Sequence, residues 1–148
     1  MTAVETSILN KIRDLARVPE LVAQLAAQHR LSPDAVFGMN VALDEMLSNI
    51  IKYGYQDDAI HEIHVRLSVS GPMLVAEIED DGQPFDPRDA PAVDVDAPLE
   101  EREVGGLGIH IVRHLMSEVD YASVAGRNRL VMKMPLDSTR GIGTNGTE

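Results

Sequence analysis

The sequence predicts an α+β fold, a two-layer sandwich in which a mixed, mostly antiparallel sheet carries its helices on one face. Three observations predict it. Helical periodicity is concentrated early in the chain, two pairs of segments that alternate apolar and polar residues follow, and a short apolar helix separates those pairs. Helices followed by hairpins are typical of α+β architectures. A length of 148 residues suits one domain with its own core.

The composition restricts the classes of function. No apolar run approaches the roughly 18 residues of a membrane span, and the N-terminus lacks a basic region followed by an apolar core, so we expect a cytoplasmic protein without membrane contact. There is no cysteine, and the five histidines show no metal-ligand spacing. The formal net charge of −11 argues against direct binding of nucleic acid. An anionic nucleotide would need a bound cation and local donors.

The first part of the chain is expected to supply an edge strand and two helices. Residues 5–11 can form the strand, and the first helix lies within 14–29. Ser32, followed by proline, indicates the start of a long helix over 34–53, which Gly54 ends. Four apolar residues fall on one face of this helix and are expected to form its core stripe: Val36, Leu43, Leu47 and Ile50.

Two hairpins are predicted after the long helix, with a glycine segment and a helix over 109–116 between them. The second hairpin turns at residues 126–128. The tail 137–148 is expected to be disordered, which leaves 1–136 as the folded domain. The four hairpin arms are residues 63–69, 74–78, 119–125 and 129–134.

The face of the long helix opposite the core stripe carries Glu45, Asn49 and Lys52. Such a face can be a solvated surface with contacts between residues four apart. Asparagine is unfavourable inside a helix, which favours a functional interpretation. A carboxylate can take a proton from a hydroxyl, and an amide oxygen one turn away suits Mg²⁺. Spacing alone leaves both interpretations open.

Alternation in the second arm of the first hairpin places Asp80 at the end of an inward-facing apolar row. A carboxylate that points toward a core needs a partner, and the exocyclic amine of a base could be that partner. The alternative is that the strand ends at Ile78 and Asp80 only caps the turn at Gly82.

The segment Gly105-Gly106-Leu107-Gly108 stands directly before the 109–116 helix. Bare backbone and free N–H groups at a helix start suit a phosphate, and a flexible hinge is the alternative. A dinucleotide fingerprint does not fit, because Ile111 stands where the fingerprint needs glycine. A P-loop does not fit either, because the Gly-Lys-Ser/Thr sequence that it needs is absent here. The preceding residues, about 84–104, are rich in proline and acids, and they form either a lid over the site or a solvated loop.

Three motifs together resemble a known family. ALDEMLSNIIKYGY resembles the N-box, DDGQPFDP the first glycine box and GGLGIHIV the second glycine box of the ATPase superfamily of histidine kinases, DNA gyrase and the ninety-kilodalton chaperone. The short length of the chain and the amino-acid sequences of the boxes are most similar to those of the anti-sigma-factor serine kinases. This resemblance implies the Bergerat-type ATP-binding fold over about residues 5–135.

The resemblance also implies roles for individual residues. Asn49 would ligate Mg²⁺, and Glu45 would act as general base toward the attacking hydroxyl. Asp80 would accept from the adenine amine, and Gly82 would give the base room. The backbone of Gly105, Gly106, Leu107 and Gly108 would wrap the phosphates of ATP. Pro84 departs from the family pattern, because a second glycine is common there, and no role is assigned to Lys52 or Arg102.

The implied function is a serine/threonine kinase that phosphorylates an anti-anti-sigma antagonist and otherwise sequesters a sigma factor or similar regulator, so that ATP controls partner switching. Members of this family are often dimers. The alternative is a non-catalytic module in which ATP creates a partner-binding surface without phosphoryl transfer.

Overall fold

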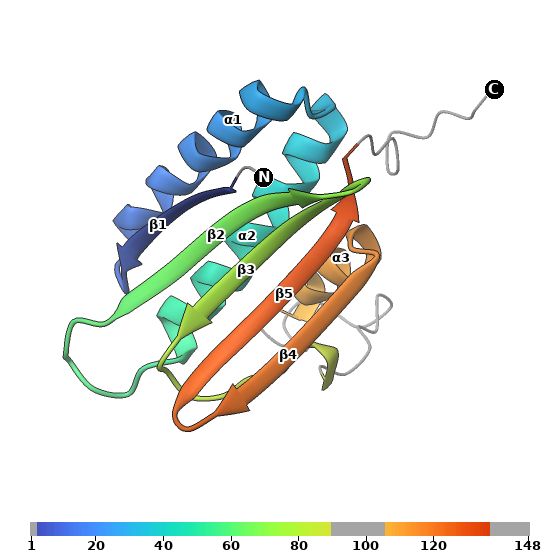
Figure 1. The fold of residues 1–148 in the computed structure, drawn as a ribbon. Helices are drawn as coiled ribbons and strands as arrows, with labels where there is room; N and C mark the ends of the chain where they lie inside the picture. The colour runs from blue at the N-terminus through green and yellow to red at the C-terminus, as the bar shows by residue number, and fades with distance from the viewer. Residues whose placement is uncertain (1–2, 90–105, 137–148) are drawn as a thin grey trace.

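Five strands form one sheet, which makes up one layer of the molecule (Figure 1). The computed structural model describes residues 3–89 and 106–136. The strands are β1 (Ala3–Leu9), β2 (Glu62–Ser70), β3 (Met73–Asp80), β4 (Glu118–Val124) and β5 (Arg127–Pro135). Their order is β1-β2-β3-β5-β4, and each of these four pairings is antiparallel. The described strands therefore contain none of the parallel pairing that a mixed sheet would have.

The helices all lie on one face of this sheet, which confirms the predicted two-layer α+β architecture (Figure 1). They are the 3₁₀ helix η1 (Ile12–Arg17), α1 (Val18–His29), α2 (Pro33–Tyr53), the 3₁₀ helix η2 (Pro87–Asp89) and α3 (Gly106–Leu115). None of the helices in the described ranges combines the length and the apolar character needed to cross a bilayer.

The start of α2 follows the sequence expectation closely. The Ser32 hydroxyl accepts a hydrogen bond from the Ala35 N–H at 3.1 Å, and proline occupies the first turn. Gly54 follows the last residue of α2, but with φ −80° it is right-handed rather than the left-handed cap that glycine often provides. The first predicted helix is divided, because η1 precedes α1.

The core lies between α2 and the sheet. Leu43 and Leu47 are fully buried as predicted, whereas Val36 and Ile50 are only partly buried at the edges of the stripe. The buried face is wider than four residues because α2 also contacts α1 on one side and α3 on the other. Its other buried residues are Ala35, Gly38, Met39, Ala42 and Met46.

The opposite face of the sheet carries charged side chains that pair across its strands. Arg66 lies 3.3 Å from Glu5 on β1 and 3.9 Å from Glu77 on β3, and Arg129 on β5 also pairs with Glu77. Such exposed cross-strand pairs add little stability individually. They do keep this face solvated and so direct the apolar residues toward the helices.

The second hairpin turns earlier than the sequence predicts. Val124 pairs with Arg127, so the turn consists of Ala125 and Gly126, both with positive φ (54° and 79°). Two positive φ values are typical of a two-residue hairpin turn. Asn128 therefore lies inside β5 and not in the turn. The predicted tail 137–148 is outside the described residues.

Candidate functional site

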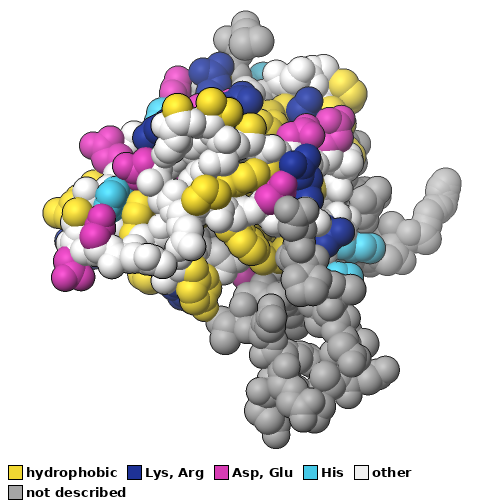
Figure 2. Space-filling model, turned by 90° about the horizontal axis from the view of Figure 1, so that it is seen from below, with side chains coloured by type: hydrophobic (Ala, Val, Ile, Leu, Met, Phe, Trp, Pro, Cys, Tyr) yellow, Lys and Arg dark blue, Asp and Glu magenta, His cyan; other side chains and the backbone are white. Residues whose placement is uncertain are grey.

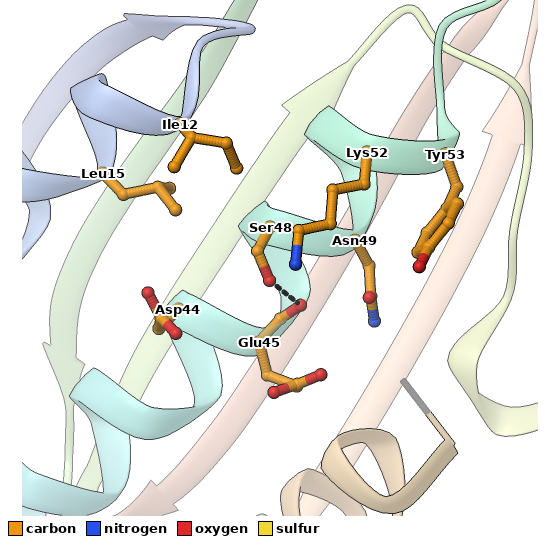
Figure 3. Close-up of a pocket in the computed structure, with 8 residues that line it drawn as sticks. All are labelled: Ile12, Leu15, Asp44, Glu45, Ser48, Asn49, Lys52 and Tyr53. Atoms are coloured by element: carbon orange, nitrogen blue, oxygen red, sulfur yellow. Dashed lines mark hydrogen bonds between the residues drawn. The ribbon is translucent and has the colours of Figure 1, made fainter. Parts of the chain in front are cut away.

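The N-box side chains on α2 border a cavity of about 380 Å³. Glu45 and Asn49 extend from the same side of the helix, toward the side on which α3 lies (Figure 3). Two residues of η1 form the apolar part of the cavity wall. The lining residues are Ile12, Leu15, Asp44, Glu45, Ser48, Asn49, Lys52 and Tyr53. The face that carries Glu45, Asn49 and Lys52 is therefore a concave surface rather than a flat solvated one.

Glu45 lies in a partly desolvated position. Burial raises the pKa of its carboxyl group, the neighbouring Asp44 raises it further, and Lys52 opposes both effects. A raised pKa makes this carboxylate a better proton acceptor near neutral pH. The arrangement can thus perform general-base chemistry on a hydroxyl group that enters the cavity.

The first turn of α3 approaches Glu45 directly. A Cβ atom added at Gly108 would overlap the Glu45 carboxylate, so any larger residue at this position would have to displace that carboxylate. Gly106, Leu107 and Gly108 belong to α3 itself, whereas the sequence analysis placed them before the helix. Gly105 lies outside the described residues. The first turn of α3 therefore lies next to the Glu45 carboxylate, and the free N–H groups at a helix start are of the kind that suit an anion.

Asp80 is buried at the end of β3, with 5% of its surface exposed. It continues the inward row of Leu74, Ala76 and Ile78, as the alternation predicts. The alternative that the strand ends at Ile78 is wrong, because β3 extends to Asp80. Asp80 does cap the turn, since its Oδ2 atom accepts the N–H of Gly82 at 2.8 Å. Its contact with a base stays a prediction.

The surroundings of Asp80 shift its acidity in both directions. Burial raises the pKa of this carboxyl group above its ordinary value, while the hydrogen bonds from Gly82 and Asn128 lower it. Gly82 lies close to the end of α2, because a Cβ atom there would approach the Gly54 carbonyl oxygen at 2.7 Å. The N–H of Gln83 donates to that same oxygen at 2.6 Å. This contact joins the Asp80 end of the sheet to the helix that carries Glu45 and Asn49.

The start of the predicted lid is tied to β4. The N–H of Phe85 donates to the Tyr121 hydroxyl at 2.9 Å, and Arg88 pairs with Asp86 at 2.7 Å while donating to the Tyr121 carbonyl at 3.3 Å. Residues 90–104, including Arg102, lie outside the described residues. Figure 2 looks onto this end of the molecule and shows hydrophobic side chains exposed among charged ones.

Asn128 is a further residue of the site that the sequence did not reveal. It is 3% exposed and donates to Asp80 Oδ2 at 3.1 Å. The interpretation of residues 126–128 as a turn concealed it. Asn128 shares its face with Leu130, Met132 and Met134, all buried, so period-two alternation along β5 could have revealed it.

The described side chains offer few ligands for a divalent ion. Among residues 3–89 and 106–136, no group of three or more His, Asp or Glu side chains could hold a metal ion by itself. Mg²⁺ commonly takes one or two protein oxygens and completes its shell with phosphate oxygens and water. Asn49, which lines the cavity, carries an amide oxygen of the kind that suits such an arrangement.

The sequence pattern of the histidine kinase-like ATPase domain matches residues 8–134 of this chain. The chain is 27% identical to the serine/threonine-protein kinase BtrW of Bordetella bronchiseptica over 73% of its length and 76% of the relative. It is 25% identical to the serine-protein kinase RsbW of Bacillus cereus over 88% of its length and 83% of the relative. An anti-sigma F factor from Thermoanaerobacter is 24% identical over 86% of this chain and 89% of its own length.

A solved structure of RsbU and RsbW domains from Mycobacterium tuberculosis has the same fold, with a TM-score of 0.66 and 17% identity. The match covers 92% of this chain but only 33% of that longer one. This likeness confirms the expected Bergerat-type fold.

Proposed function

Since this chain belongs to the histidine kinase-like ATPase domain family, we propose that it binds Mg²⁺-ATP and transfers the γ-phosphate to a serine or threonine of an anti-anti-sigma protein. The observation that carries this proposal is the contact between Glu45 and Gly108. It brings a proton-accepting carboxylate to the first turn of the helix whose N–H groups suit a phosphate.

The residues of the three motifs have separate roles in this proposal. The Asp80 carboxylate accepts a hydrogen bond from the adenine amine, and Gly82 leaves room for the base. The backbone of residues 105–108 surrounds the phosphates. Asn49 would hold Mg²⁺, which would supply neutralisation of the phosphate charge when bound.

Glu45 performs the proton transfer. It accepts the proton of the acceptor hydroxyl while that oxygen forms a bond to the γ-phosphorus. The bond from the γ-phosphorus to the bridging oxygen breaks, and ADP leaves with the electron pair. The raised pKa of Glu45 suits this role, because it increases the affinity of the carboxylate for the proton.

The names of the relatives support the choice of partner. Two are serine or serine/threonine kinases, and one is an anti-sigma factor. We therefore propose that this protein also sequesters a sigma factor or a similar regulator, and that phosphorylation of the antagonist controls which partner is held.

A direct test uses purified anti-anti-sigma proteins from the same genome, incubated with this protein and Mg²⁺-ATP labelled on the γ-phosphate. We expect label on one serine or threonine of one acceptor, and none when that residue is changed to alanine. A wild-type protein that binds ATP and captures a partner in an ATP-dependent way, yet labels no acceptor, would support the non-catalytic binding module instead.

A further inference from the structure

Three polar residues form a row across neighbouring strands at the Asp80 end of the sheet. Asn128 on β5 is the register partner of Asp80 on β3 and of Ser123 on β4. Asp80 and Asn128 are buried, whereas Ser123 is exposed at the edge strand. The row therefore connects the solvent edge of the sheet to the buried carboxylate.

Hydrogen bonds fix the orientation of the Asn128 amide. Its Nδ2 atom donates to Asp80 Oδ2 at 3.1 Å and to the Gly82 carbonyl at 2.8 Å, while its Oδ1 atom accepts from the Ser123 hydroxyl at 2.7 Å. A flipped amide would direct its oxygen at two acceptors and its NH₂ at a hydroxyl. One orientation thus satisfies the donors and acceptors around the amide.

The two oxygens of the Asp80 carboxylate differ in their hydrogen bonds. Oδ2 accepts from both Gly82 and Asn128, and these are the hydrogen bonds of the Asp80 side chain within the described residues. The lone pairs of Oδ1 are therefore available to accept a hydrogen bond from a ligand. Because Oδ2 is held at two points, the carboxylate has little freedom to rotate.

We propose that Asn128, oriented by Ser123, is a positioning residue that holds Asp80 with Oδ1 toward the base and so determines the preference for a 6-amino purine. This inference rests on the proposed function, because it assumes that Asp80 contacts the base. Asn128 and Ser123 act through Asp80 and need not touch the nucleotide.

The preference follows from donor and acceptor matching at the purine 6-position. An ionised Oδ1 accepts from a 6-amino group but repels a 6-oxo group. In Asp80→Asn, the amide oxygen must take the place of Oδ2, since Gly82 and Asn128 both donate there. The new NH₂ group would then face the base and favour a 6-oxo purine such as that of ITP.

Asn128 also helps to keep Asp80 ionised. Its hydrogen bond lowers the pKa of the Asp80 carboxyl group, which opposes the effect of burial. A variant that weakens this hydrogen bond without adding a charge, such as Ser123→Ala, should therefore lose nucleotide affinity at a higher pH than wild type as the solution is acidified. A residue that only filled space would not produce this shift.

The test is calorimetric titration of Mg²⁺-ATP and Mg²⁺-ITP into wild type, Asn128→Asp and Ser123→Ala between about pH 8.5 and about pH 6.5. In Asn128→Asp a second carboxylate faces Asp80, so ATP affinity at the upper pH should fall about tenfold or more. It should recover as the pH falls, because a proton shared by the two carboxyls replaces the amide donor. Wild type should show no such gain on acidification.

Ser123→Ala tests the orientation of the amide at an exposed position that should tolerate the change. We expect a loss of ATP affinity of about threefold to tenfold and a smaller ratio of ATP to ITP affinity. The matched control is Ser70→Ala on β2, an exposed serine away from this row, which should bind both nucleotides as wild type does.

The outcomes separate this inference from the proposed function. If folded wild-type protein binds no ATP, both fail. If wild type binds ATP but Ser123→Ala keeps its affinity, purine preference and pH profile, the positioning role is wrong while the ATP site stands. Should Asn128→Asp not fold, the result with Ser123→Ala decides.

Discussion

The two ends of the candidate site are built in different ways. At the sheet end, Asp80 and Asn128 are buried, and both are held in place by side-chain and main-chain hydrogen bonds. At the helix end, Glu45 and Asn49 are only partly buried and line an open cavity between α2 and η1. At the sheet end, neighbouring strands hold the side chains in fixed positions. At the helix end, side chains from separate helices surround an open space.

This difference suggests a division of function. Groups fixed by adjacent strands are preorganised, so they can discriminate between bases at little entropic cost. Groups around a cavity can admit a second protein and its hydroxyl. Variants at the sheet end should therefore change nucleotide affinity and choice, while variants at the helix end should change phosphoryl transfer.

The largest expected effect tests the helix end. Glu45→Gln keeps the size of the side chain but removes the proton acceptor, so transfer to the acceptor protein should fall by about 10²–10⁴-fold. ATP affinity measured by calorimetry should stay within about threefold, since no base contact is lost. The control is Glu20→Gln on the exposed side of α1. Undiminished transfer by Glu45→Gln would remove the assignment of Glu45 as the base.

A smaller effect is expected at Gly108. In Gly108→Ala the new methyl group must displace the Glu45 carboxylate, and a shift of about 1 Å can cost about 100-fold in transfer rate. Gly71→Asn is the control, because Gly71 has open space around its Cα, and asparagine tolerates its positive φ of 58°. Equal transfer rates for the two variants would mean that the contact with Glu45 has no role in positioning.

The N-cap of α2 separates stability from site function. Ser32→Ala removes the acceptor for the Ala35 N–H and should lower the free energy of unfolding by about 1 kcal/mol, as measured by urea denaturation. Ser32 lies more than three turns of helix from Glu45, so ATP affinity should stay unchanged in the folded protein. A large loss of affinity would show that the two ends of α2 are coupled.

The smallest effect concerns His61, which links the loop after α2 to the segment after β3. Its ring lies 3.0 Å from Asp57 and 3.2 Å from Asp81, and it stacks on Tyr55. The hydrogen bond to Asp57 raises the pKa of His61, although its partial desolvation opposes this. The stabilisation from the charged ring is therefore complete below the unfolded-state pKa near 6.5 and is lost as pH rises through the folded-state pKa.

Thermal unfolding of wild type and His61→Gln at a series of pH values measures this effect. The wild-type advantage in Tm should be greatest below about pH 6 and should shrink as the pH rises through the raised pKa of His61. His61→Phe keeps a ring to stack on Tyr55 and serves as the control for packing. A difference in Tm that is constant with pH would show that packing alone accounts for His61.

The sequence predicted features that depend on local rules. Alternation identified the inward position of Asp80 at the sheet end. Away from the site, the serine–proline pair identified the start of α2. It failed at Ala125, because alanine rarely adopts a positive φ, so the glycine and asparagine that follow looked like the turn. That shift concealed the position of Asn128 next to Asp80.

The helix end was predicted only as a list of residues. Helix geometry placed Glu45 and Asn49 on one face, but no local rule gives the distance between α2 and α3. The overlap of the Glu45 carboxylate with a side chain at Gly108 depends on tertiary packing. The sequence could therefore explain the glycines as phosphate contacts without showing that Gly108 also makes room for the base.

Calorimetric titration of Mg²⁺-ATP into wild type and Asp80→Asn, with Mg²⁺-GTP as the control nucleotide, tests the central claim most directly. We expect saturable binding of ATP but not of GTP to the wild type, and loss of ATP binding in Asp80→Asn. Absence of ATP binding by folded wild-type protein, or equal ATP affinity in the two proteins, would contradict it.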